Sequence, residues 1–336
     1  FMLLGIIWLS LIHFEATHEF SFDVQTLVHM KIDPSTQVWL FLFFLSAFAI
    51  KIPIFPLHSW LPHAYISSPI PVLLILTGAM SKAGAYGIIR FCLPLFPDAV
   101  DKFGLVIAFG AAAGIVYGAW IAVAQRDLKA LVAYSSISHL GFIALGIFAL
   151  NGEGIEGSVL QMVNHGIIAS ALFIIVGILE KRMNSRSLDD FRGLGKAMPL
   201  LYGMFMLITL AALGLPGLNG FVGEFLILMG VWTSLLLADL SVIYVLMAGL
   251  AIVFASIYML HMFQGAMQEK NDKIPEGLTD INSREFGLLL PACILVVLIG
   301  LYPKPFIDRV TPSVESILTM EKTLNLHAGE DKGDHH

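Results

Sequence analysis

Nine apolar stretches divide this chain, and they set the class of fold it can adopt. They cover residues 1–14, 36–63, 70–96, 103–125, 128–150, 155–180, 198–236, 240–267 and 285–303. A helix needs about 20 apolar residues to cross the hydrocarbon core of a bilayer. Only 13% of the residues are charged, against roughly 25% in ordinary globular domains. We therefore expect an all-α, polytopic membrane helix bundle with about nine transmembrane helices.

Two of these stretches contain helix-breaking residues near the middle. In residues 36–63, Lys51 is followed by Pro53 and Pro56, and proline removes an N–H donor and clashes with the preceding turn. The stretch 198–236 is too long for one straight crossing. Its helix breakers are Gly214, Pro216, Gly217 and Gly220. Two discontinuous helices, each with a charge beside its break, are typical of ion sites in transporters built from inverted repeats.

Three ionisable side chains lie deep within apolar stretches: Lys51, Lys82 and Glu224. A charge at mid-membrane costs about 2.5–3.5 kcal/mol on insertion scales, so three rival the ~5–15 kcal/mol of net stability of a typical domain. No acid lies within one helical turn of either lysine, and no base lies within one turn of Glu224. We interpret the three as proton-transfer groups whose partners come from other helices.

Polar residues form a stripe on each of three predicted helices. The stripes are Thr77, Ser81, Lys82 and Tyr86; Tyr134, Ser135, Ser138 and His139; and Ser158, Gln161, Asn164 and His165. Hydroxyl and amide side chains on such stripes most simply hold helices together. Imidazole titrates near neutrality, so His139 and His165 are predicted to relay protons along the membrane plane.

Metal binding is the alternative use of these two histidines. First-row metals take three or more protein ligands, and no carboxylate or thiolate lies near His139 or His165 in sequence, so we expect no metal site. His58 and His63 follow the first break, where capping or gating is as reasonable as proton handling. His261, near the end of its stretch, fits either a helix-end residue or a relay.

Motifs for enzymatic chemistry are missing from the sequence. It has no dinucleotide-binding glycine motif, no Walker A motif, no C-x-x-C pair and no serine nucleophile elbow. Cys92 and Cys293 lie in different apolar stretches and are interpreted as apolar fillers. The net charge is only −6, which indicates no nucleic-acid surface. We expect no redox cofactor in this chain.

Lysine and arginine are unevenly distributed between the two sets of alternating loops, which predicts orientation. The richer set contains the loop 180–198, which we place in the cytoplasm, with the C-terminal tail on the other side. Residues 1–310 are predicted to form the transmembrane domain. The tail, 311–336, is predicted to be an interfacial helix over Val314 to Leu326 followed by a disordered end. Because Phe1 lies inside an apolar run, we also expect a truncated N-terminus.

Four segments resemble the antiporter-like subunits of respiratory complex I. They are Lys51 to Pro62 (KIPIFPLHSWLP), Ser81 to Gly87 (SKAGAYG), Asp127 to His139 (DLKALVAYSSISH) and Leu215 to Phe225 (LPGLNGFVGEF). The same superfamily includes multisubunit sodium/proton antiporters and membrane-bound hydrogenases. An acid at Glu224, where sibling subunits and antiporters usually carry lysine, is similar to the M branch, the counterpart of mitochondrial chain 4.

The resemblance implies a fourteen-helix fold, in which these nine would be helices six to fourteen and the seventh and twelfth would be broken. It implies that Lys51 is the lysine of modulated pKa, Lys82 the central lysine, His139 and His165 the connecting histidines, and Glu224 the terminal acid on the exit side. Two features depart from the family. The fifth-helix glutamate that pairs with Lys51 would fall before Phe1, and His63 and Tyr65 replace a common Asp and His.

The function implied is a proton-translocating membrane subunit of NADH:quinone oxidoreductase, and hence part of an enzyme whose redox site lies elsewhere. NADH, FMN, iron–sulfur clusters and quinone are then expected on partner subunits. The expected partners are other membrane subunits, including sibling antiporter-like subunits, and the lipid bilayer of a bacterial cytoplasmic membrane rather than an organellar one. The alternatives are a subunit of a sodium/proton antiporter or membrane-bound hydrogenase, a metal-dependent membrane enzyme, and a structural anchor.

Overall fold

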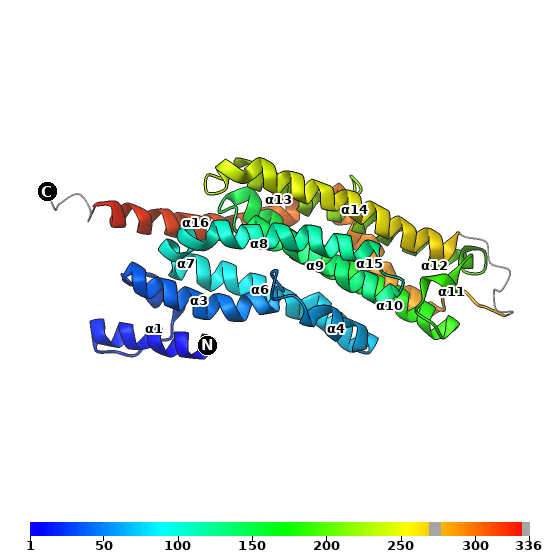
Figure 1. Cartoon of the computed structure of the whole chain (residues 1–336), viewed down its shortest axis with the longest axis horizontal. Coiled ribbons are helices and arrows are strands. Elements are labelled where there is room, and N and C mark those ends of the chain that lie inside the picture. Colours follow the sequence, from blue (N-terminus) through cyan, green and yellow to red (C-terminus); the bar gives the residue numbers. More distant parts are fainter. Residues whose placement is uncertain (269–276, 331–336) are drawn as a thin grey trace.

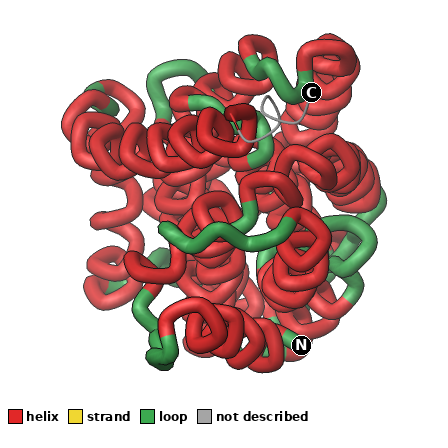
Figure 2. The backbone as a smooth tube through the Cα atoms, turned by 90° about the vertical axis from the view of Figure 1, so that its left-hand side faces the viewer, coloured by secondary structure: helices red, strands yellow, loops and turns green. Residues whose placement is uncertain are grey.

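The computed structural model describes residues 1–268 and 277–330, with side chains described up to residue 319. Within these ranges the regular secondary structure consists of helices, together with one isolated bridge between Asp127 and Ser187. The long helices run roughly along the longest axis of the molecule (Figure 1). Viewed along that axis, they form a bundle whose connecting loops are mostly short (Figure 2). The predicted all-α bundle is confirmed.

Seven helical segments are long and apolar enough to cross a membrane. They are α3 (Pro34–Lys51), α5 to α7 (Ile70–Leu95), α8 (Pro97–Val123), α9 (Leu128–Ile147), α10 (Gly152–Met183), η4 with α14 (Ala238–Met267) and α15 (Ser283–Leu301). Three shorter apolar helices are α1 (Met2–Thr17), α12 (Pro199–Ala212) and α13 (Asn219–Thr233). Every predicted apolar stretch therefore overlaps at least one of these helices. Between them lie the short elements α2 (Val24–Val28), α11 (Leu188–Phe191) and η3 (Leu194–Lys196).

Both predicted breaks are present. The first separates α3 from α4 (Trp60–Ser67), and the second separates α12 from α13. In the second break, Gly214 and Gly217 have φ values of +75° and +92°, which strain any residue with a Cβ atom. The sequence located these breaks correctly because proline and glycine act on the backbone where they stand.

The predicted stripe on the third stretch is wrong at one position. This stretch is α5 (Ile70–Ile75), α6 (Ser81–Gly87) and α7 (Leu93–Leu95), joined by π-helical turns η1 (Leu76–Met80) and η2 (Ile88–Cys92). The wider turn of η1 places Thr77 beneath Lys82 at a spacing of five, and both are buried. Tyr86 instead is 58% exposed, on the outward face with Ala79 and Ala83.

Helix α9 is the central element of the bundle. In its most apolar window, 94% of the residues are buried. Small residues allow this close packing: a Cβ atom at Gly118 of α8 would lie 2.7 Å from the Ser138 backbone nitrogen, and one at Gly141 would lie 3.0 Å from the Ala111 carbonyl oxygen. Small residues at helix contacts are typical of membrane bundles, where close approach of backbones replaces the hydrophobic effect.

The C-terminal part consists of α15 and α16 (Lys304–Glu330). A helix thus covers the predicted segment Val314 to Leu326, but it begins earlier, inside the region assigned to the transmembrane domain. Its position at a membrane surface, and the division into domains, stay predictions. The tail end predicted to be disordered begins within α16, and residues 331–336 lie outside the described residues.

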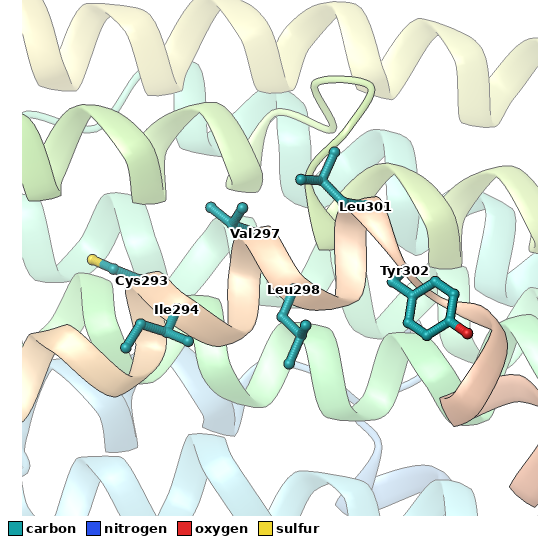
Figure 3. A pocket seen from close by; sticks show the side chains of 6 residues that line it. All are labelled: Cys293, Ile294, Val297, Leu298, Leu301 and Tyr302. Carbon is teal, nitrogen blue, oxygen red and sulfur yellow. The ribbon is translucent and has the colours of Figure 1, made fainter.

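The outer face of α15 carries a shallow apolar groove of about 500 Å³ (Figure 3). Its lining residues are Cys293, Ile294, Val297, Leu298, Leu301 and Tyr302. Cys293 and the fully buried Cys92 are both free thiols. The apolar surroundings of both agree with their interpretation as fillers.

Candidate proton-transfer site

Lys82 lies on α6, inside the bundle, and is only 9% exposed. Its ammonium group donates a hydrogen bond to the carbonyl oxygen of Thr77. Its Nζ atom also lies 2.7 Å from Nδ1 of His165 on α10. The prediction that Lys82 faces the interior is confirmed, and its partners come from a π-helical turn and a neighbouring helix.

The two predicted relay histidines are neighbours. The rings of His165 and His139 have centroids 5.7 Å apart and are tilted by 43°. Nδ1 of His139 then lies 3.0 Å from Oε1 of Glu224 on α13. His165, His139 and Glu224 are 3%, 7% and 5% exposed. A charge on any of them is therefore held away from the surrounding solvent or lipid.

These four side chains form a continuous series, which we call the Lys82–Glu224 row: Lys82, His165, His139 and Glu224. Its members come from α6, α10, α9 and α13, so each helix contributes one group. Two of its three steps are within hydrogen-bonding distance, and the middle step is the ring-to-ring gap. Lysine, imidazole and carboxylate can each bind and release a proton, which makes the row capable of passing protons.

The second helix break makes room for the acid at the end of the row. A Cβ atom at Gly214 would lie 3.0 Å from Oε2 of Glu224. Gln161 donates a hydrogen bond of 3.4 Å to the other carboxylate oxygen, Oε1. Sequence analysis identified Gly214 as a helix breaker, but not as the residue that leaves space for the carboxylate.

The amide side chains beside the break have a structural role. Nδ2 of Asn164 donates a 2.7 Å hydrogen bond to the backbone carbonyl of Asn219, the first residue of α13. Nδ2 of Asn219 donates in return to Oδ1 of Asn164, at 3.2 Å. This reciprocal pair fixes the beginning of α13 on α10, at positions five residues before Glu224 and one residue before His165.

Several buried polar atoms around the row have no hydrogen-bond partner among the described residues. They are Nε2 of both His139 and His165, Oε1 of Gln161, Oγ1 of Thr77 and the hydroxyls of Tyr65 and Tyr258. Buried polar groups normally have partners, so these atoms mark where further hydrogen-bonding groups fit along the row. Tyr65 lies near Thr77 and Ser81, and Tyr258 lies near Ser135 and Glu224.

The structure does not bring Lys51 into the row. Lys51 is the last residue of α3, its side chain is exposed, and no hydrogen bond or ion pair joins it to another described residue. Its backbone does lie against α6, because a Cβ atom at Gly84 would be 2.9 Å from Cβ of Lys51. The expectation that all three charges are buried is therefore wrong for Lys51, whose exposed side chain has no hydrogen-bonding or ion-pair partner among the described residues. Its role stays a prediction.

The other three histidines considered in the sequence analysis differ in their exposure. His58 is 7% exposed in the first break, where its ring stacks on Phe55 at 5.2 Å and meets the edge of Tyr117 at 4.7 Å. His63 and His261 are exposed. Among the described residues, no group of three or more histidine, cysteine, aspartate or glutamate side chains is arranged to hold a metal ion. The role of His261 stays a prediction, as does the expectation of no metal.

Known proteins share both the sequence and the arrangement. The sequence is 39% identical to NADH-quinone oxidoreductase subunit M of Pseudomonas aeruginosa over 94% of this chain, and 40% identical to that of Mycobacterium tuberculosis over 85%. The chain spans 61% and 51% of the lengths of these two relatives. The structure is similar to a chain of respiratory complex I from Thermus thermophilus, with a TM-score of 0.86 and 31% identity, covering 96% of this chain and 68% of that one.

A family profile gives the same assignment. The family described as NADH:quinone oxidoreductase/Mrp antiporter, transmembrane, matches residues 1–254. This range contains all four members of the row and both breaks. The resemblance predicted from the four sequence segments is thus confirmed, and the chain belongs to the transmembrane family of NADH:quinone oxidoreductase and Mrp antiporter subunits.

Proposed function

We propose that this chain moves protons across the membrane as part of an NADH:quinone oxidoreductase, with the Lys82–Glu224 row as its path. The observation that carries the proposal is the continuity of the row across four helices. Four ionisable groups buried together are costly in an apolar bundle, and a structural ion pair would need only two. The similarity to two proteins named NADH-quinone oxidoreductase subunit M supports the choice of complex.

Hydrogen-bond geometry gives the direction in which each group can act. A protonated Lys82 has donors only, so Nδ1 of His165 must accept, which leaves the proton of a neutral imidazole on Nε2. A proton received at Nδ1 can then be released from Nε2 toward His139. His139 can pass a proton from Nδ1 to Oε1 of Glu224. Each imidazole takes up a proton at one ring nitrogen and loses one at the other.

Electrostatics limits how many protons the row holds at once. Two positive charges cannot remain 2.7 Å apart in a poorly solvated site, so protonation of His165 requires Lys82 to lose its proton. A negatively charged Glu224 attracts the positive charge toward its end of the row. Moving one proton against 100 mV requires about 2.3 kcal/mol, which the row itself does not supply.

The energy is proposed to come from quinone reduction in partner subunits. NADH, FMN, iron–sulfur clusters and quinone are assigned to those subunits, together with the redox reaction, and the neighbours of this chain are sibling antiporter-like subunits. The seven long apolar helices make the chain a multi-pass membrane protein. A bacterial cytoplasmic membrane is the proposed location, and Lys51 is proposed to take part in proton transfer.

Replacement of Lys82 by alanine tests the path. In the assembled complex, Lys82→Ala should abolish most proton pumping per NADH oxidised, because the row loses its first donor. Lys102→Ala is the matched control, since Lys102 is exposed on α8 and lies 5.8 Å from the Phe103 ring centroid. Normal pumping by an intact Lys82→Ala complex would contradict the proposal. Sodium-dependent transport without quinone reduction would instead favour an antiporter.

A further inference from the structure

Two cations hold the end of α4, the second half of the first broken helix. Lys129, in the first turn of α9, donates a 3.3 Å hydrogen bond to the Ser68 carbonyl. Nη1 of Arg186 donates a 3.3 Å hydrogen bond to the Ile66 carbonyl. The last carbonyls of a helix lack intrahelical partners and carry partial negative charge, so the two cations match this end.

Carboxylates from neighbouring elements balance these cations. Oε2 of Glu180, in the last turn of α10, lies 3.4 Å from Nζ of Lys129, and its Oε1 lies 3.9 Å from Nε of Arg186. Asp127 lies 3.2 Å from the same Arg186 atom. Lys129 is only 5% exposed. Glu180 therefore pairs with a nearly buried lysine and helps to direct it at α4.

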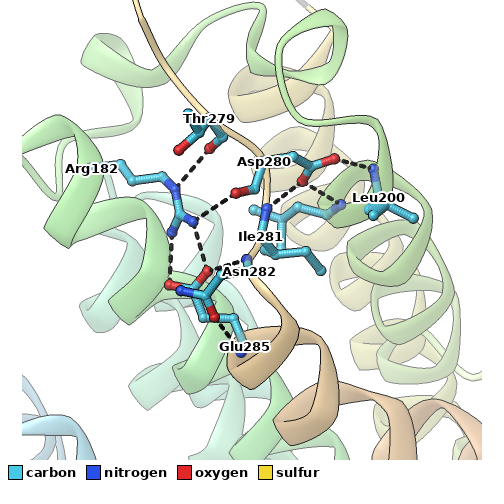
Figure 4. Close-up of polar contacts among 8 residues, drawn as sticks. Arg182, Leu200, Thr279, Asp280, Ile281, Asn282 and Glu285 are labelled. Atoms are coloured by element: carbon cyan, nitrogen blue, oxygen red, sulfur yellow. Dashed lines mark hydrogen bonds and ion pairs between the residues drawn. The ribbon is translucent and has the colours of Figure 1, made fainter.

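Two residues further along α10, Arg182 belongs to a second network (Figure 4). Its guanidinium forms a two-pronged ion pair with Glu285 of α15, at 3.0 and 2.7 Å. It also donates 3.0 Å hydrogen bonds to the carbonyls of Thr279 and Asp280. The side chains of Arg182 and Glu285 are only 14% and 16% exposed. Arg182 thereby fixes the backbone on both sides of the Asp280 side chain.

Asp280 in turn holds the beginning of α12, the first half of the second broken helix. Its carboxylate accepts hydrogen bonds from the backbone amides of Leu200 and Leu201, at 2.7 and 3.2 Å. The first amides of a helix lack partners and carry partial positive charge, which suits an acid. One broken helix ends at this end of the bundle and the other begins there, so they require opposite charges.

Both networks depend on the last turn of α10. Residues two apart on a helix point about 200° from one another, so Glu180 and Arg182 lie on opposite faces of α10. We propose that this turn is a clasp that couples the two broken helices. Glu180 and Arg182 are its positioning residues: they set the position of α4 and α12 on the helix that also carries His165. A displacement of either half-helix is then transmitted to the other.

This coupling goes beyond the proton path and can be tested without measuring transport. If the networks were two independent helix caps, each substitution would affect its own side alone. Coupling between two sites is reciprocal, so a change at either network must also affect the other. The two proposals are independent of each other. Evidence against the proton path would not contradict the clasp, and evidence against the clasp would not contradict the proton path.

Amide hydrogen exchange on the full-length protein in its native assembly measures the coupling. Glu180→Gln should accelerate exchange roughly tenfold in the last turn of α4 and also at Leu200 and Leu201, where Glu180 makes no contact. Arg182→Lys keeps the charge but loses the two-pronged geometry, and it should accelerate exchange at the same two places.

The control is Arg126→Gln, because Arg126 pairs with Asp189 at 3.0 Å and its side chain is 68% exposed. It should change exchange at neither place. Glu180 has a side chain 35% exposed, so Glu180→Gln is the variant that carries the test if Arg182→Lys fails to assemble. Faster exchange at α4 alone in Glu180→Gln, with Leu200 and Leu201 unchanged, would overturn the clasp.

Discussion

The two broken helices differ in what surrounds their charged residues. At the second break, Glu224 is 5% exposed and has His139 and Gln161 within reach. At the first break, Lys51 is exposed and has no hydrogen-bonding or ion-pair partner among the described residues. The first break is lined instead by the aromatic stack of Phe55, His58 and Tyr117. A break in a helix therefore does not by itself create a buried ion site, which also needs groups from adjacent helices.

The largest difference should appear in transport. Glu224→Gln removes the carboxylate that ends the row, and pumping in the assembled complex should fall at least about tenfold, since a positioned proton-transfer group contributes that much or more. Pumping is measured as protons moved per NADH oxidised. Glu153→Gln, an exposed position on α10, is the control and should pump normally. Equal pumping by both variants would remove the second break from the path.

A second prediction concerns the backbone of the second break. Gly214→Ala should lower the free energy of unfolding by about 1–3 kcal/mol, because a Cβ atom at φ +75° is strained and would lie 3.0 Å from Glu224 Oε2. Unfolding in mixed detergent micelles measures the change. Gly152→Ala is the matched control, since nothing lies within 4 Å of its Cβ position. Equal effects of the two substitutions would disprove the special role of Gly214.

The aromatic stack at the first break should contribute less. His58→Ala should destabilise the chain by about 1–2 kcal/mol, through lost ring contacts and lost burial. His58→Phe should recover most of this loss, because it keeps a ring between Phe55 and Tyr117. The same micelle unfolding measurement distinguishes them. If His58→Phe were as destabilising as His58→Ala, a polar role for the imidazole would be indicated.

The smallest effect is expected for Lys51 in this 336-residue chain. Lys51→Ala should change the free energy of unfolding by less than about 0.5 kcal/mol, because the side chain is exposed and makes no described ion pair. Reduced pumping with unchanged stability would identify Lys51 as a functional group. A large loss of stability would show instead that this lysine has a structural partner.

The spans and breaks were predictable from the sequence because they depend on local properties. The length of an apolar stretch predicts a membrane span directly. The local backbone is likewise interrupted at the helix-breaking residues Pro53, Pro56, Gly214 and Gly217. The interior position of Lys82 also followed from sequence, because Lys82 shares a polar stripe with Thr77 and Ser81. Lys51 shows that a lone charge in an apolar stretch can instead lie exposed. The order of the four row members was implied by the resemblance to the M branch. The residue pattern of a single helix does not predict this order.

Features that depend on several elements could not be read from the sequence. The exposure of Tyr86 follows from the π-helical turn before Ser81, which helical spacing does not reveal. Tyr65 and Tyr258 come to the row from other helices. Arg182 falls within the stretch 180–198, whose cations only predict orientation, although it meets Glu285, 103 positions away in the chain.

The ring centroids of His139 and His165 are 5.7 Å apart, and this separation has a mechanical consequence. A proton hop needs a hydrogen bond of about 2.6–3.2 Å, directly or through one intervening molecule. Sliding α9 alone by the width of an atom would change this step and the His139–Glu224 contact together, because Asn164 and Gln161 of α10 hold α13 in place. Lys82 would keep its contact with His165. Proton transfer along the proposed path would then stop at His139, the member of the row that lies on α9, while Lys82 stayed paired with His165.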